Sequence, residues 1–527
     1  MEFLQGIEPR EYQKRIFQTC VQKNCLVVLS TGLGKTLIAL MVAIERMKLF
    51  PGQKIVFLAP TRPLAEQHLR YFRKHLPELF ADMQIFTGEV SPENRRKIWE
   101  TADIVFSTPQ CIANDVKNRL YDLRDACLLV EDEAHRCIKN YDYNFIAQNY
   151  IQNAKNPRII GLTASPGSEK AKIKEICRNL SIEEVELRSR DSEDVKEYVQ
   201  EMEFERINLD FPPEMEEIRQ SLSELFSRYT DELKNRRLLF GPASKVALIE
   251  LQRKIMTYIA AGNRNFNYLL ASSACAQAIK IQHALELLET QTLESFGRYL
   301  ENLLEQARKG ESKGVIKLVA RPEFTFVVLR TKLLLEKGVE HPKIQELINL
   351  VKREFGKNSS AKILVFTQFR DTASIISKKI NEIESGKIKS KIFVGQAKKT
   401  SSGKNKEVTG LNQKEQRRVI SEFSSGEINV LCATSIGEEG LDIPEVNVVV
   451  FYEPIPSAIR AIQRAGRTAR LQKGKLIILI TKKTRDESYF YVSKLKEKKM
   501  HESIHSIKDD MKLNGKIKEN KGIQKRL

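Results

Sequence analysis

The sequence predicts an α/β protein in which two parallel-sheet domains flank an all-helical insertion. Three observations support this fold class: two separate sets of short apolar runs, a middle segment with helical periodicity, and a length of 527 residues. A single hydrophobic core rarely serves more than about 250 to 300 residues, so the chain should divide into several domains. Apolar residues make up 41% and charged residues 29% of the chain, which excludes collagen-like, wholly disordered and disulfide-scaffold proteins.

The first set of apolar runs lies in the first third of the chain. Each run is a short β-branched segment followed by a polar turn and then by a helical pattern. The runs cover residues 26–29, 55–58, 103–106, 127–130 and 158–162. Continuous rather than alternating hydrophobicity indicates strands that are covered on both faces. We therefore expect a doubly wound parallel sheet with helices on both sides.

A second set of runs begins after residue 360, at residues 363–366, 391–394, 429–432, 446–452 and 476–480. Between about residues 205 and 340 strand signals fade and helical ones dominate. One apolar stripe in this middle segment is formed by Val246, Leu248, Ile249, Leu251, Ile255, Met256 and Ile259. Pro212 and Pro213 mark the entrance of the segment, and residues 338–342 mark its exit.

Basic residues outnumber acidic ones by 19, with 87 Lys and Arg against 68 Asp and Glu, and the pI is about 9.4. This surplus favours a polyanionic partner such as nucleic acid, although the ion-pair networks of heat-adapted proteins would also use it. Residues 231–280 carry eight basic and three acidic groups, which suits either phosphate contacts or a solvated helix face. Residues 481–527 carry 14 basic and seven acidic groups, and we expect the end of this tail to be disordered.

Eight cysteines are scattered without a CxxC pair or a histidine at metal-ligand spacing, so reduced and mostly buried thiols are expected. No apolar stretch reaches the roughly 18 residues that a membrane span requires, and residues 1–10 contain no apolar signal core. These observations predict a soluble cytoplasmic protein without a membrane partner.

A glycine-rich loop follows the first apolar run and precedes a helical pattern over residues 37–50. The loop consists of Ser30, Thr31, Gly32, Leu33, Gly34, Lys35 and Thr36. Glycines allow a tight turn whose N–H groups surround phosphates, while Lys35 reaches the β- and γ-phosphates and Thr36 ligates Mg²⁺. The strict P-loop pattern has Gly where this chain has Leu29, and a glycine-rich turn without a ligand is the alternative. The strand–loop–helix setting favours the phosphate loop.

Two adjacent carboxylates, Asp132 and Glu133, stand at the end of the fourth apolar run, in the sequence VEDEAH. Carboxylates at the end of a buried strand are costly unless a cation matches them, and a nucleotide-bound Mg²⁺ would supply that cation. Asp132 would then hold the metal, and Glu133 would orient and deprotonate the attacking water. A solvated strand end is the alternative, which a phosphate loop in the same sheet disfavours.

Three arginines, Arg464, Arg467 and Arg470, lie in the sequence QRAGRTAR that begins at Gln463. Their i, i+3, i+6 spacing gathers them on one helical flank. Clustered cations need an anion, so the two interpretations are a solvated basic surface and a phosphate-facing site. The position just past a buried strand favours the second, with Arg467 and Arg470 as arginine fingers.

These motifs, in this order, resemble those of DEAH-containing superfamily 2 helicases, and most closely the helicase portion of the archaeal Hef and FANCM family of fork-remodelling enzymes. The resemblance extends over about residues 8–485. It implies two RecA-like motor domains that sandwich ATP and Mg²⁺ between them. The catalytic residues would be Lys35, Asp132, Glu133, Gln463, Arg467 and Arg470, with Thr36 and Asp132 as metal ligands.

The resemblance also implies roles for residues outside the catalytic set. Gln13 resembles the glutamine that recognises adenine, and Gly440 and Asp442 resemble nucleotide contacts of the second domain. The residues that couple hydrolysis to movement would be His135, Thr163 and Ser165. The residues that grip the nucleic-acid strand would be Pro60, Thr61, Arg62, Thr87, Gly88, Thr108, Gln110, Thr367, Gln368 and Thr434.

On this resemblance the chain would divide into a first RecA-like domain (1–203), a thumb-like, DNA-engaging helical insertion (204–340), a second RecA-like domain (341–490) and a basic tail (491–527). The implied activity is that of an ATP-dependent DNA helicase or translocase, nucleoid-associated, which acts on forked, branched or junction DNA in replication-fork repair and recombination.

Two departures and two alternatives accompany this assignment. Ala469 replaces the Gly that many relatives carry between the last two arginines, and no ERKxxxD nuclease signature is present. The chain should therefore unwind or translocate without cutting, and whether it works with a separate nuclease or repair partner is left open by the sequence. The alternatives are a double-stranded-RNA-dependent ATPase or RNA helicase, and a non-catalytic DNA-binding platform with a helicase fold.

Overall fold

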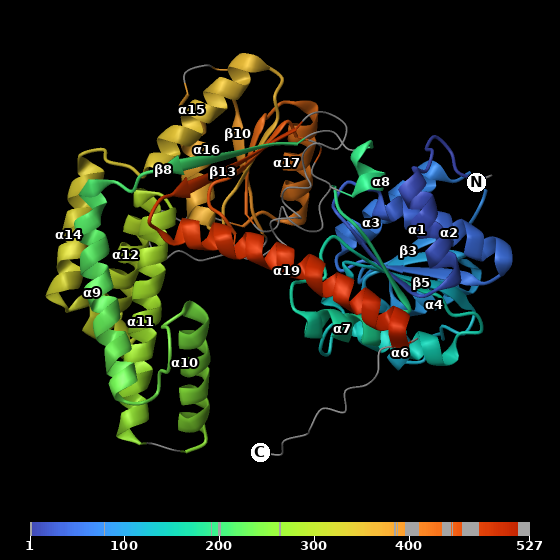
Figure 1. Ribbon diagram of the computed structural model, residues 1–527, viewed down its shortest axis with the longest axis horizontal. Helices are drawn as coiled ribbons and strands as arrows, with labels where there is room; N and C mark the ends of the chain where they lie inside the picture. The colour runs from blue at the N-terminus through green and yellow to red at the C-terminus, as the bar shows by residue number, and fades with distance from the viewer. Residues whose placement is uncertain are drawn as a thin grey trace.

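The computed structural model describes residues 3–77, 79–190, 192–198, 202–262, 265–383, 386, 388–395, 410–434, 444, 446–455 and 474–514. It contains two parallel sheets and a helical bundle, so the predicted fold class is confirmed. Figure 1 shows the bundle and the first sheet domain at opposite ends of the molecule, with the second sheet domain between them. Within the described ranges, no helix is long and apolar enough to span a membrane.

The first domain is built on a seven-stranded sheet in the order β3-β4-β2-β5-β6-β1-β7. Every pairing in it is parallel. Its strands are β1 (Cys25–Leu29), β2 (Lys54–Leu58), β3 (Met83–Phe86), β4 (Ile104–Ser107), β5 (Ala126–Asp132), β6 (Ile159–Thr163) and β7 (Glu184–Arg188). The sequence predicted the five inner strands. It missed the edge strands β3 and β7, because these are only partly buried and lack a continuous apolar run.

Helices cover both faces of this sheet. One face packs against α1 (Glu11–Gln22), α2 (Lys35–Leu49) and α3 (Arg62–His75). The other face packs against α4 (Pro92–Thr101), α5 (Pro109–Lys117), α6 (Asp142–Asn153) and α7 (Lys170–Asn179). A short turn of helix, α8 (Glu193–Lys196), follows the last strand. This layering explains why the inner strands are apolar on both sides.

The second domain is built on a six-stranded parallel sheet in the order β10-β11-β9-β12-β13-β8. Its strands are β8 (Met202–Leu209), β9 (Ile363–Phe366), β10 (Ser390–Phe393), β11 (Val430–Ala433), β12 (Val448–Phe451) and β13 (Gly474–Thr481). The described helices that accompany it include α15 (Pro342–Lys357), α16 (Arg370–Asn381) and α17 (Gln413–Ser425).

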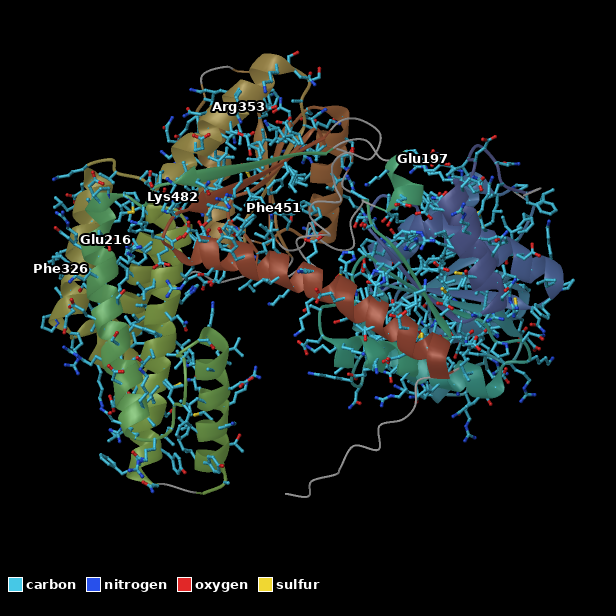
Figure 2. All side chains as sticks on the ribbon, in the orientation of Figure 1. Glu197, Glu216, Phe326, Arg353, Phe451 and Lys482 are labelled. Atoms are coloured by element: carbon cyan, nitrogen blue, oxygen red, sulfur yellow. The ribbon has the colours of Figure 1, made fainter. Side chains whose placement is uncertain are left out.

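Strand β8 corrects the predicted domain boundaries at 203 and 204. It pairs with β13 along its whole length, from Met202 opposite Gly474 to Leu209 opposite Thr481. The chain therefore enters the second sheet before it enters the helical insertion. Charged residues interrupt the sequence of β8. One of them, Glu205, pairs with Lys475 of β13 and with Arg353 of α15; Figure 2 labels Arg353. This edge strand is held by ion pairs as well as by its ladder, so it shows no continuous apolar run.

The described part of the insertion is a bundle of six helices around its own core. These helices are α9 (Pro213–Asn235), α10 (Lys245–Ala260), α11 (Phe266–Thr290), α12 (Leu293–Arg308), α13 (Lys313–Val319) and α14 (Pro322–Glu336). The predicted stripe on α10 is partly wrong. Leu248, Leu251 and Ile255 are buried, whereas Val246 and Met256 are 66% and 53% exposed, because α10 packs against α11 on one side only.

The bundle is fixed to the second domain by a fully buried junction. The side chains of Lys343 and Asp486 form an ion pair in which neither is exposed to solvent, and Lys343 Nζ also donates to the carbonyl of Thr290, at 3.1 Å. The carboxamide of Gln291 accepts from the hydroxyl of Thr367 of the second domain, at 3.2 Å. At the rim of the junction, Lys482, which Figure 2 labels, pairs with Asp210, just before the start of α9.

The segment predicted as a basic tail is mostly a helix. Helix α19 (Arg485–Asn514) begins in the second domain and crosses to the first domain, as Figure 1 shows. Its residues Met500, Ile504, Ile507 and Met511 are buried in the core of the first domain. The boundary at 490 and 491 is therefore interrupted by a continuous helix, and the expected disorder at the end of the tail concerns residues 515–527, which lie outside the described ranges.

Candidate nucleotide site and strand-facing loops

The glycine-rich loop connects β1 to α2 and has the backbone that a phosphate loop needs. Gly32 and Gly34 have φ angles of 90° and 81°, in the left-handed region that side chains other than glycine rarely adopt. Gly34 caps α2, so this helix begins at Lys35. The N–H groups of its first turn therefore point back toward the loop. Lys35 Nζ donates to the carbonyl of Leu29, at 3.0 Å. The ammonium group thus lies over the loop where phosphates would sit.

Gln13 of α1 braces this loop from the side. Its amide Nε2 donates to the carbonyl of Leu33, at 3.0 Å, and its Oε1 accepts from the backbone N–H of Arg10, at 2.9 Å. The hydroxyl of Tyr12 donates to the same Leu33 carbonyl, at 2.8 Å. A Cβ atom on Gly34 would lie 2.3 Å from Gln13 Nε2, so the glycine is also required for this close approach. The glutamine assigned to adenine recognition therefore adjoins the loop.

The metal-ligand candidates Thr36 and Asp132 are connected through His68 of α3. His68 Nε2 lies 2.8 Å from Asp132 Oδ2, and His68 Nδ1 lies 3.4 Å from Thr36 Oγ1. Burial disfavours the charged form of Asp132, but the neighbouring His68 and Lys35 hold the pKa of this carboxyl below its ordinary value. A carboxylate and a hydroxyl are consequently held together beside the phosphate loop.

Glu133 begins a relay of side chains that leads away from the nucleotide site. Its φ of 52° places it in the left-handed region, at the turn after β5. Glu133 Oε2 lies 3.2 Å from His135 Nδ1, which in turn lies 3.3 Å from the hydroxyl of Thr163. The Thr163 hydroxyl also accepts from the backbone N–H of Ser165, at 3.1 Å. The residues assigned to hydrolysis and to coupling are therefore in contact one after another.

Glu131 points to the opposite face of the sheet from Asp132, as the alternation along a strand requires. It is fully buried, and the thiol of Cys137 donates to its Oε2, at 3.0 Å. Burial raises the pKa of Glu131 to about 8. The three acidic residues of the VEDEAH sequence thus occupy different environments, and Glu131 packs in the core.

The residues predicted to grip the nucleic acid from the first domain lie at the carboxyl ends of β2, β3 and β4. They are Pro60, Thr61, Arg62, Thr87, Gly88, Thr108 and Gln110, and they share one edge of the sheet. Gly88 and Gln110 are exposed, Thr87 is buried, and the others are half-buried. The guanidinium of Arg62 contacts the carboxylates of Glu66 and Glu89. Its charge is therefore held by two carboxylates at this edge.

The residues predicted to grip the nucleic acid from the second domain are less accessible. Thr367 is fully buried and donates to Gln291 of the bundle, so in this structure its hydroxyl is a packing contact rather than an exposed one. The backbone N–H of Gln368 donates to the carboxylate of Glu453. Thr434 is buried, and its N–H donates to the carbonyl of Phe393, at 3.1 Å. Gly440, Asp442, Gln463, Arg467 and Arg470 lie outside the described residues.

The residues present fit a magnesium-bound nucleoside triphosphate. Mg²⁺ prefers oxygen ligands, usually takes one or two from the protein, and completes its shell with phosphate oxygens and water. Thr36 and Asp132 supply such a pair, next to the Lys35 ammonium. Among the described residues, no group of three or more His, Cys, Asp or Glu side chains could hold a metal ion on its own. The site therefore suits a cation that arrives with its phosphates.

Sequence reasoning missed His68 and Met500. His68 lies six residues after Arg62 in a helical pattern, and nothing in its sequence neighbourhood indicates that it bridges α2 and β5. Met500 Sδ accepts from the fully buried Ser165 hydroxyl, at 2.8 Å, from a helix that was predicted as tail. Both residues depend on tertiary contacts that local periodicity does not report.

Three family descriptions match the chain in separate stretches. Residues 10–173 match "DEAD/DEAH box helicase", and residues 342–472 match "Helicase conserved C-terminal domain". Residues 214–337 match "Putative ATP-dependent RNA helicase, helical bundle". These stretches correspond to the first sheet domain, the second sheet domain and the bundle.

Curated relatives and a solved structure cover almost the whole chain. The chain is 37% identical to "Putative ATP-dependent RNA helicase MJ1505" of Methanocaldococcus jannaschii, over 95% of this chain and 61% of that protein. It is 32% identical to "Putative ATP-dependent DNA helicase fml2" of Schizosaccharomyces pombe, over 92% of this chain and 62% of that protein. The chain spans less than two thirds of the length of both relatives. The crystal structure of the Pyrococcus furiosus Hef helicase domain is 42% identical, with a TM-score of 0.70, and the alignment covers 93% of this chain and 100% of that one.

Proposed function

The chain belongs to the superfamily 2 helicases related to Hef and FANCM, and from this premise we propose that it is an ATP-dependent DNA helicase or translocase that acts on forked or branched DNA. The relatives named as DNA helicases and the Hef helicase domain support the assignment to DNA. The proposed setting is replication-fork repair and recombination at the nucleoid, and we propose a nuclease or repair protein as a partner there.

One observation carries the enzymatic part of this proposal. Lys35, Thr36 and Asp132 come from two elements far apart in sequence, and His68 connects the last two within hydrogen-bonding distance. A loop that only turned the chain would need neither the paired carboxylates nor the bridging imidazole. Together these residues form a site in which Lys35 would bind a triphosphate, and Thr36 and Asp132 would bind its cation.

The chain's own residues would divide the hydrolytic work among them. Lys35 would leave the Leu29 carbonyl and bind the β- and γ-phosphates, and Gln13 would hold the adenine beside the loop. Bound Mg²⁺ would neutralise charge on the phosphates. Glu133 would orient the attacking water and accept its proton. We assign Gln463, Arg467 and Arg470 of the second domain to completing the site when the two domains close, the arginines stabilising charge at the γ-phosphate.

DNA would bind along the carboxyl-end loops of the first domain, toward the bundle. Phosphate contacts through hydroxyl and backbone groups make such a grip independent of base sequence. Movement follows if closure with ATP and opening with ADP change the affinity of one domain for the strand relative to the other. The excess of basic residues over acidic ones between residues 231 and 280 would add phosphate contacts from the bundle.

The nucleotide site is tested by removing its charged groups. Lys35→Ala and Glu133→Gln should each lower DNA-stimulated ATP hydrolysis by on the order of 100-fold or more, because phosphate binding and water activation are lost. DNA binding in a filter or anisotropy assay should stay near the wild-type value. Lys74→Ala, which removes an exposed lysine on α3, is the matched control and should hydrolyse ATP normally. Hydrolysis that survives both site variants would overturn this assignment.

RNA is the second candidate substrate, because one relative and the family description of the bundle are named for RNA helicases. The two candidates separate in an ATPase titration with single-stranded, duplex, forked and junction DNA and the matching RNAs, at one stated salt concentration. Forked or junction DNA should stimulate hydrolysis most. Equal or greater stimulation by double-stranded RNA would transfer the assignment to RNA.

A further inference from the structure

Helix α19 is rooted at its first turn in both the second domain and the bundle. Asp486 pairs with the buried Lys343 and accepts from the backbone N–H of Thr481, at 2.9 Å. Arg485 pairs with Glu289 of α11, at 2.8 Å, and the hydroxyl of Tyr489 donates to Glu286 of the same helix, at 3.2 Å. The start of α19 therefore moves with these two bodies.

The middle of α19 crosses between the bodies in solvent. Residues 491–499 are exposed, except for the half-buried Ser493, and Tyr491 and Leu495 are 56% and 67% exposed. A helix rises about 1.5 Å per residue, so these nine residues bridge roughly 13 Å without a turn or break. A continuous helix transmits displacement along its axis, whereas a flexible linker would absorb it.

The second half of α19 is docked along the segment that follows β6. Met500, Ile504, Ile507 and Met511 are spaced four, three and four residues apart and lie buried on one face. Polar contacts also join α19 to the segment after β6, in the same order along both. Ser503 Oγ donates to the Ser168 carbonyl, at 3.3 Å, and farther along Asp510 pairs with Lys170 and Lys174, at 3.2 and 2.8 Å. The helix thus contacts residues 165–174 at several successive positions.

The first of these points is the coupling residue Ser165. Its hydroxyl is fully buried and donates to Met500 Sδ, at 2.8 Å, while its backbone N–H donates to the Thr163 hydroxyl. Thr163 contacts His135, and His135 contacts Glu133. A series of contacts therefore runs from the water-activating carboxylate to a helix whose other end is fixed in the second domain.

We propose that α19 is a coupling strut and that Met500 is a positioning residue for Ser165. When the second domain and the bundle move during the nucleotide cycle, α19 carries the displacement to the Thr163–Ser165 loop. A movement of that loop is likewise carried by α19 to the second domain and the bundle. The inference rests on the proposed motor function. It does not require Met500 to touch nucleotide or DNA. Loss of the strut should therefore separate hydrolysis from strand movement.

The strut is tested by softening its exposed middle. The triple variant Leu495→Gly, Glu497→Gly, Lys499→Gly changes exposed side chains in the full-length chain, and its matched control carries Ala at the same three positions, because glycine weakens a helix interior and alanine supports it. We expect the glycine variant to keep the kcat and KM of fork-stimulated ATP hydrolysis and to lose about fivefold or more of its fork-unwinding rate. The alanine variant should unwind like the wild type. Equal unwinding by the glycine and alanine variants would overturn the proposal.

A second variant tests the Met500 contact without altering the strut. Met500→Leu keeps the apolar volume but removes the sulfur acceptor, and Met511→Leu makes the same change farther along the buried face. We expect Met500→Leu to raise the ATP consumed per base pair unwound by about threefold to tenfold, and Met511→Leu to leave it unchanged. An unchanged ratio in Met500→Leu would show that Met500 only fills space. If the wild-type chain itself neither hydrolyses ATP nor unwinds DNA, the proposed function fails, and that result is distinguishable from both of these.

Discussion

The two junctions of the second domain are built differently. Its junction with the bundle is buried, and it is held by the hydrogen bonds from Lys343 to the Thr290 carbonyl and from Thr367 to Gln291, beside the Lys343–Asp486 ion pair. Its described connections to the first domain include the exposed middle of α19 and an ion pair between Arg417 of α17 and Glu66 of α3, at 3.0 Å. Buried ion pairs and hydrogen bonds resist opening, whereas exposed pairs and a single helix yield easily. The difference indicates that the bundle moves with the second domain and that the first domain moves relative to both.

The largest effect should come from breaking the buried junction. Asp486→Ala leaves the Lys343 ammonium buried without its carboxylate, so the free energy of unfolding should fall by about 3 to 5 kcal/mol. Chemical denaturation measures this loss. The double variant Lys343→Met, Asp486→Leu removes both charges and should lose much less. A loss below about 1 kcal/mol in Asp486→Ala would mean that the junction is not a rigid one.

The sequence predicted the inner strands of both sheets and the glycine-rich turn between β1 and α2, because the signals for these elements are local. It could not predict the two junctions. The edge strand β8 carries Glu203, Glu205 and Arg206 in place of an apolar run, and its pairing with β13 is a contact between segments far apart in the chain. The four-three-four spacing of apolar residues in α19 is visible in the sequence, but the domain that buries them is not.

The candidate site was predictable to a similar degree. Lys35, Asp132 and Glu133 occur in motifs whose spacing follows from phosphate and metal chemistry. His68 and Met500 are single residues inside helices, and only the packing of α3 and α19 brings them to Asp132 and Ser165. Residues that position a catalytic group therefore escape a sequence reading more easily than the group itself.

Acid should loosen the buried junction in particular. His341 is fully buried there, its Nε2 lies 3.2 Å from the Glu289 carbonyl, and burial lowers its pKa to about 3. The unfolded chain binds this proton near pH 6.5 and the folded chain does not, so stability is present above pH 6.5 and declines as the pH falls toward 3. The loss from this group should reach about 2 kcal/mol at pH 5. Denaturation curves between pH 7 and 5 measure it, and a His341→Gln variant that keeps the same slope would contradict the assignment.

The smallest effect should come from the exposed ion pair between the domains. Arg417→Ala removes a side chain that is 55% exposed and paired across the domains with Glu66, so the free energy of unfolding should change by less than about 1 kcal/mol. Differential scanning calorimetry at low and high salt measures this change. A loss of about 2 kcal/mol or more would show that this junction is as fixed as the buried one.

The most direct test follows distances between fluorescent labels on three exposed positions: Phe326 on the bundle, Arg353 on the second domain and Glu197 beside α8 of the first domain, all labelled in Figure 2. The partly buried Cys111 is first replaced by Ser, so that the labels attach to the introduced cysteines. Between ADP and a non-hydrolysable ATP analogue with forked DNA, the Phe326–Arg353 distance should stay constant while the Glu197–Arg353 distance shortens. A Phe326–Arg353 distance that changes as much as the other, or a Glu197–Arg353 distance that does not respond to nucleotide, would contradict the account.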